Sequence, residues 1–89
     1  MYRVIKPRGG GKTTEILHLA EETGATVLCA NPRLMQQKIK TEGFNTNVRC
    51  ISYNDIMFEH NHVYLIDEID GFLRALAPNI IGYSLSPED

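Results

Sequence analysis

The chain has 89 residues, a length typical of one small domain that spans residues 1–89. Hydrophobic residues make up 43% of it and charged residues 22%, as in globular proteins and unlike disordered ones. The formal net charge of −2 argues against a protein whose main task is to coat nucleic acid, because such domains carry a basic excess. A local basic patch is compatible with this charge, so nucleic-acid binding stays open without support from the composition.

Neither the start of the chain nor its apolar runs indicate export or membrane insertion. The first residues lack the pattern of a signal peptide, and no apolar run approaches the roughly 20 residues that a membrane span needs. Cys29 and Cys50 lie in the apolar runs TVLCA and VRCIS, which favours buried, reduced thiols over a disulfide. We therefore expect a cytoplasmic protein that does not bind membranes.

The first third of the chain alternates between β-prone and helical patterns. Residues 2–5 (YRVI) are a short β-prone run. Residues 12–22 place their apolar side chains at helical spacing and are followed by Thr23-Gly24, so they predict a helix. Residues 26–30 (TVLCA) are a continuous apolar run, which predicts a strand covered on both faces.

The alternation continues to the end of the chain. We expect further helices over residues 33–41, 54–59 and 72–77, and further strands over residues 48–53, 62–66 and 79–83. Strands that alternate with helices are typical of an α/β fold in which helices cover both faces of a mostly parallel sheet. The pattern therefore predicts an α/β three-layer sandwich with a mostly parallel five-stranded sheet.

The segment KPRGGGKTT, residues 6–14, has the character of a phosphate-binding loop. The usual pattern is G-x-x-x-x-G-K-[ST], and here its first glycine position is occupied by Lys6. Gly9, Gly10 and Gly11 would let successive backbone N–H groups face one anion. The alternative is a glycine-rich turn that happens to precede a surface lysine. A β-prone run before the loop and a helix after it favour the phosphate-binding interpretation.

The two residues that follow the glycines supply the remaining chemistry of such a loop. Lys12 would place a positive charge on the β- and γ-phosphates of a nucleotide, and the hydroxyl of Thr13 would be a ligand of Mg²⁺. The helix that starts here would point its positive end at the phosphates.

Asp67 and Glu68 directly follow the apolar run of residues 63–66. Carboxylates at the carboxyl end of a parallel strand lie where open α/β sheets bind ligands. Asp67 would hold Mg²⁺ through its water shell, and Glu68 would act as general base on the attacking water. The alternative is a solvated acidic loop that caps the next helix, which is also what we expect of Asp70.

Together, KPRGGGKT and VYLIDE resemble the Walker A and Walker B motifs of P-loop NTPases. The glutamate that directly follows the aspartate of the Walker B motif resembles a feature of one branch of this family. That branch contains RecA-like ATPases, superfamily 1/2 helicases and phage terminases. ANPRLMQQKI looks like the segment after motif Ia of those helicases, and GYSLSPED looks like their motif III or the coupling motif of terminases. The resemblance implies a RecA-like core in which residues 79–83 form the strand between residues 2–5 and residues 62–66.

The resemblance also implies a set of site residues and two cofactors, ATP and Mg²⁺. Lys12 and Glu68 would be catalytic, Thr13 and Asp67 would hold the metal, and Ser84 or Ser86 would sense the γ-phosphate. The nucleotide would be bound by Arg8, Gly9, Gly10, Gly11, Lys12, Thr13 and Thr14.

We expect a weak ATPase that needs oligomerisation or a larger protein partner for full activity. Lys6 departs from the family pattern. Because the sequence stops after the last predicted strand, we expect no second RecA-like domain and none of its usual arginine finger. The small size is typical of a phage or mobile-element product in a bacterial cell. An alternative function is a regulatory or docking module that reuses the P-loop fold. A third interpretation is a subunit of a nucleic-acid translocase, which the acidic net charge disfavours.

Overall fold

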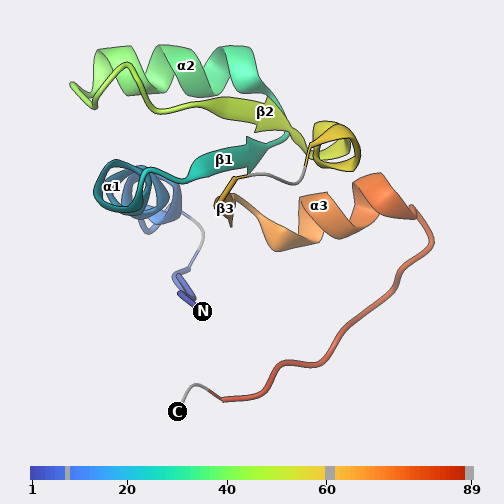
Figure 1. The fold of residues 1–89 in the computed structure, drawn as a ribbon. Helices are drawn as coiled ribbons and strands as arrows, with labels where there is room; N and C mark the ends of the chain where they lie inside the picture. Colours follow the sequence, from blue (N-terminus) through green and yellow to red (C-terminus); the bar gives the residue numbers. More distant parts are fainter. Residues whose placement is uncertain (8, 60–61, 88–89) are drawn as a thin grey trace.

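The computed structural model describes residues 1–7, 9–59 and 62–87. Figure 1 shows the arrangement of the helices and strands. In chain order they are α1 (Lys12–Thr23), β1 (Thr26–Cys29), α2 (Pro32–Thr41), β2 (Cys50–Ser52), the 3-10 helix η1 (Tyr53–Phe58), β3 (Tyr64–Ile66) and α3 (Ile69–Leu76). No helix in these ranges combines the length and the apolarity that crossing a membrane requires.

The described strands form one parallel sheet in the order β2-β1-β3. Val27 lies level with Cys50 of β2 and with Leu65 of β3. Since both pairings are parallel, the carboxyl ends of the three strands meet at one edge of the sheet. That edge is where the chain continues into α2, η1 and the acidic segment after β3.

One face of the sheet is covered by α1 and α2. Helix α1 has its apolar residues on one stripe, and Leu17 is fully buried against Val27 and Cys29 of β1 within a single core cluster. Ile39 of α2 joins the same cluster. This packing positions the amino end of α1 next to the carboxyl end of β3.

The other face of the sheet is covered by η1 and α3. Leu28 and Ile51 point into a second cluster with Tyr53, and Phe72 of α3 packs on the edge of the Tyr53 ring with centroids 5.7 Å apart. Helices therefore lie on both faces of the sheet (Figure 1).

The predicted five-stranded, RecA-like sheet is wrong, because the sheet has only three strands. Residues 2–5 and 79–83 are described and are not strands, so the predicted order with residues 79–83 beside residues 62–66 is wrong as well. Both segments are largely solvent-exposed: Ile5 is 80% exposed and Ile81 fully so. A strand exists only where a neighbour completes its hydrogen bonds and covers its side chains. These short β-prone runs bury too little to offset the entropy of ordering them.

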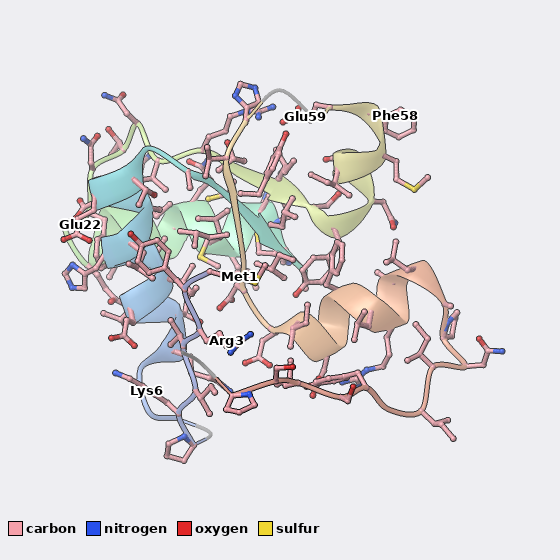
Figure 2. The ribbon with its side chains drawn as sticks, turned by 60° about the horizontal axis from the view of Figure 1, so that its bottom comes forward. Met1, Arg3, Lys6, Glu22, Phe58 and Glu59 are labelled. Carbon is pink, nitrogen blue, oxygen red and sulfur yellow. The ribbon has the colours of Figure 1, made fainter. Side chains whose placement is uncertain are left out.

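Polar contacts join the two terminal segments to each other and to the folded body. The guanidinium of Arg3 donates to the carbonyl of Ser86 over 2.8 Å, which holds the C-terminal segment beside the N-terminal one (Figure 2). The hydroxyl of Tyr83 donates to the carboxylate of Asp70 over 2.7 Å. These contacts are exposed to solvent and lie outside the sheet.

Candidate functional site

The glycines before α1 are required by the shape of the loop. Gly11 precedes the helix with φ 83°, and Gly9 has φ 76°, in the left-handed region that favours glycine. The N–H of Gly10 donates to the carbonyl of Pro7 over 2.9 Å, and a Cβ on Gly10 would lie 2.8 Å from that oxygen. The loop therefore turns sharply into α1.

The two acidic residues lie in a tight turn between β3 and α3. The N–H of Asp67 donates to the carbonyl of Leu28 over 2.9 Å, so the strand pairing extends to the first acidic residue. Glu68 has φ 62° and is the one non-glycine residue with positive φ in the described ranges. Such a conformation costs on the order of 1–3 kcal/mol and persists only where surrounding contacts hold it.

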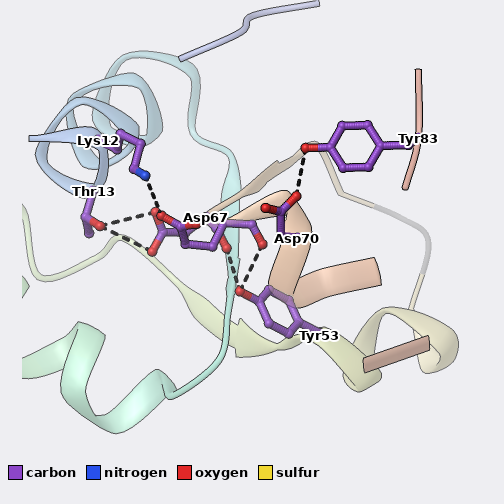
Figure 3. A network of polar contacts seen from close by, with 7 residues as sticks. Lys12, Thr13, Tyr53, Asp67, Asp70 and Tyr83 are labelled. Carbon is purple, nitrogen blue, oxygen red and sulfur yellow. Dashed lines mark hydrogen bonds and ion pairs between the residues drawn. The ribbon is translucent and has the colours of Figure 1, made fainter. Parts of the chain in front are cut away.

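The fold brings the loop and the acidic turn into direct contact (Figure 3). The hydroxyl of Thr13 lies 3.2 and 3.3 Å from the two carboxylate oxygens of Asp67, although 54 positions separate these residues. The Nζ of Lys12 lies 2.9 Å from a carboxylate oxygen of Glu68. Four predicted site residues thus meet where the amino end of α1 faces the carboxyl end of β3.

Burial raises the pKa of Asp67 above the ordinary value of 3.8, and the nearby carboxylate of Glu68 raises it further. The hydrogen bond from Thr13 and the charge of Lys12 act in the opposite direction. The ionised form of Asp67 is therefore incompletely solvated. A cation placed next to it would favour that form.

The donor set of the site fits Mg²⁺. Thr13 supplies a hydroxyl oxygen and Asp67 supplies carboxylate oxygens, the hard ligands that Mg²⁺ prefers. Magnesium is commonly held by one or two carboxylates together with substrate phosphates, so no larger ligand cluster is needed. Over the described ranges no group of three or more His, Cys, Asp or Glu side chains is placed to hold a metal.

Tyr53 is a part of this site that our sequence analysis did not predict. It is buried at the end of β2, and its hydroxyl donates to the carbonyl of Asp67 over 2.6 Å; the carbonyl of Glu68 lies 3.3 Å away. A Cβ on Gly71 of α3 would lie 3.1 Å from the Tyr53 hydroxyl oxygen, so α3 approaches closely only because that residue is glycine. The sequence carried only a general signal for this contact, namely that the hydroxyl of a buried tyrosine needs a hydrogen-bond partner.

The other predicted site residues lie elsewhere. The hydroxyl of Thr14 donates to Glu42 of the α2 terminus over 3.3 Å, away from Asp67. Ser84 and Ser86 are exposed in the C-terminal segment, and the hydrogen bonds of the described residues do not link either serine to Lys12 or Asp67. Arg8 lies outside the described residues.

Comparisons of the chain with protein-family models, with curated proteins and with solved structures found no match. The resemblance to P-loop NTPases therefore stays a prediction from the two sequence motifs.

Proposed function

We propose that the chain binds Mg-ATP at the loop of residues 9–14 and hydrolyses it slowly. The contact between Thr13 and Asp67 carries this proposal. It joins the predicted metal ligands of two motifs that lie far apart in the sequence, and it does so at the amino end of a helix, where phosphates are favoured.

Each residue of the site has a distinct task in this proposal. The backbone N–H groups of the glycine loop and the ammonium of Lys12 would bind the phosphates. Thr13 and Asp67 would hold Mg²⁺, which would offset the negative charge of the phosphates. Before nucleotide binds, Lys12 is paired with Glu68. A phosphate that takes over Lys12 would release the carboxylate of Glu68, which could then accept a proton from the attacking water.

We expect slow hydrolysis because the proposal includes no arginine finger. Such a residue contributes about 10³–10⁵ in rate where it is used. A second copy of the chain or a larger protein partner would supply it. Turnover per chain should then rise with protein concentration or on addition of that partner.

The test is calorimetric titration of Mg-ATP, and of a slowly hydrolysed analogue, into the wild type and Lys12→Ala. Lys40→Ala is the matched control, because Lys40 is exposed on α2 and forms no ion pair with the described residues. We expect the wild type and Lys40→Ala to bind and Lys12→Ala to lose binding. Glu68→Gln should then bind nucleotide with little or no turnover. Equal binding by all of these variants would contradict the proposal.

A second candidate function is a docking module in which nucleotide is structural or absent. The observation in its favour is the exposure of large apolar side chains in the terminal segments and at the end of η1 (Figure 2). They include Ile5, Phe58, Ile81 and Leu85. If folded wild type shows no heat at millimolar Mg-ATP, the ATPase proposal fails and the docking function becomes the better explanation.

A further inference from the structure

An ion pair joins the two ends of the glycine loop. The Nζ of Lys6, directly before Pro7, lies 3.3 Å from a carboxylate oxygen of Glu15 in the first turn of α1. Figure 2 shows the side chain of Lys6 beside the start of this helix. Lys6 occupies the position at which the usual phosphate-loop pattern has its first glycine. The departure from that pattern therefore has a defined contact in the structure.

The side chain of Lys6 also packs on the backbone of the loop. A Cβ on Gly10 would lie 3.2 Å from the Cβ of Lys6, and the N–H of Gly10 donates to the carbonyl of Pro7 over 2.9 Å. The Lys6 side chain is 39% exposed, so most of its surface is covered. A glycine at this position would have neither the Cβ nor the ammonium. Lys6 thus forms one side of the turn and is tied to α1 at its tip.

This ion pair is separate from the contacts of the metal ligands. Glu15 follows Thr13 by two positions, which sets their side chains about 200° apart around the axis of α1. Since the hydroxyl of Thr13 contacts Asp67, the ion pair belongs to the other side of the helix. Lys12 has a partner of its own in Glu68. The ion pair therefore bears on the shape of the loop and leaves the metal ligands untouched.

We propose that the ion pair of Lys6 and Glu15 is a brace that holds the glycine loop in its turned shape, so that both are positioning residues of the nucleotide site. Its effect on Mg-ATP rests on the proposed function, whereas its effect on the loop does not. Because both side chains are partly exposed, the brace is worth a factor of about two to five in an equilibrium constant. The alternative is a direct contact of Lys6 with a phosphate, for which Glu15 would be a competitor.

Calorimetric titration of Mg-ATP into single variants separates the brace from the direct contact. Glu15→Gln should weaken binding about two- to fivefold, although it removes a negative charge near the phosphates. If Lys6 contacted phosphate directly, the same change would free the lysine and tighten binding. Lys6→Gly restores the usual pattern of the motif and should nevertheless weaken binding. Glu22→Gln, at an exposed position on the same helix, is the matched control and should bind like the wild type.

An exchange of the two charges tests the brace with the net charge unchanged. The double variant Lys6→Glu with Glu15→Lys restores the attraction in reverse order, so it should bind Mg-ATP more tightly than either of its single variants. A second measurement needs no nucleotide. The N–H of Gly10, which bonds within the turn, should exchange with water about two- to fivefold faster in Glu15→Gln and recover in the double variant. Amide exchange in NMR measures it.

Three results would overturn the inference. They are tighter Mg-ATP binding in Glu15→Gln, wild-type affinity in Lys6→Gly, and an exchange rate of the Gly10 N–H that does not depend on Glu15. A double variant that binds more weakly than both single variants would point to the direct phosphate contact instead. If the wild type does not bind Mg-ATP while the Gly10 exchange still follows the two charges, the proposed function fails and the brace stands.

Discussion

At the scale of single residues, the hydroxyl of Tyr53 connects the end of β2 to the acidic turn. It donates to the carbonyl of Asp67, directly before the residue with the left-handed backbone, Glu68. Burial raises the pKa of Tyr53 to about 12, so the hydroxyl stays protonated and remains a donor at neutral pH. This hydrogen bond holds the turn in the shape that directs Asp67 to Thr13 and Glu68 to Lys12.

We predict that Tyr53→Phe lowers the free energy of unfolding by about 1 kcal/mol, the typical net value of one hydrogen bond. The same change should weaken Mg-ATP binding, because the acidic turn loses its tether. Urea denaturation and calorimetry measure the two effects. Tyr2→Phe is the control, since the Tyr2 side chain is 62% exposed. Unchanged nucleotide affinity in Tyr53→Phe would mean that the turn keeps its shape without the hydroxyl.

Gly10 provides a second test at this scale. In Gly10→Ala the new Cβ would meet the carbonyl of Pro7 at 2.8 Å, a distance that forces the loop backbone to move. We predict that this variant stays folded, because the loop is outside the core, and loses Mg-ATP affinity at least tenfold. Gly82→Ala is the matched control, because nothing lies within 4 Å of its added Cβ. Calorimetry on both variants decides the question, and equal affinities would show that the loop does not bind phosphate.

At the scale of elements, one polar network joins β2, η1 and β3. Arg49, next to the start of β2, forms a two-pronged ion pair with Glu59 after η1, with one N–O distance of 2.7 Å. The hydroxyl of Tyr64 in β3 lies 3.1 Å from the same carboxylate. The hydrogen bonds from Arg49 are the main cause that lowers the pKa of Glu59 from 4.5 to about 2.

This network predicts a stability change in acid. Because the pKa of Glu59 is lower in the folded state, its contribution is present above the unfolded value of 4.5 and is lost as the pH falls towards about 2. The thermal midpoint of the wild type should fall across this window by more than that of Glu59→Gln. Circular dichroism melts between pH 5 and pH 2.5 measure the difference. Glu22→Gln, at an exposed position on α1, should behave like the wild type.

The helices were predicted more closely than the strands. The pattern of residues 12–22 predicted α1 (Lys12–Thr23) nearly to the residue, because a 3.6-residue repeat and a terminal Gly24 define a helix locally. The predicted strand over residues 48–53 is shorter in the structure, since β2 ends where Tyr53 begins η1. Helix α3 begins earlier than predicted, at Ile69, because the turn at Asp67 and Glu68 takes up only two residues.

At the scale of the whole molecule, the centre of the chain carries the fold and both ends lie outside the sheet. Val27 and Leu28 of β1 are buried and paired on both sides. Residues 2–5 and 79–83 are not part of that sheet, although their sequences are β-prone.

We predict that hydrogen exchange divides the molecule in the same way. Amides of residues 27–29 and 50–52 should be protected up to the free energy of global unfolding, whereas those of residues 2–5 and 79–87 should exchange almost as fast as in an unstructured peptide. NMR or mass-spectrometric exchange at neutral pH measures this. Strong protection of residues 79–83 in the isolated chain would contradict the three-stranded sheet.

The sequence by itself determined the local features of this protein. Glycines, helical repeats and a pair of carboxylates after an apolar run depend on neighbours along the chain, so the glycine loop, α1 and the acidic turn could be predicted. The contacts of Thr13 with Asp67 and of Lys12 with Glu68 came from the fold. Only the tertiary structure decided how many strands the sheet has and that the hydroxyl of Tyr53 supports Asp67. These features depend on contacts between segments that are far apart in the sequence. The residues of a β-prone segment, or a buried tyrosine, do not show which other segment they will contact.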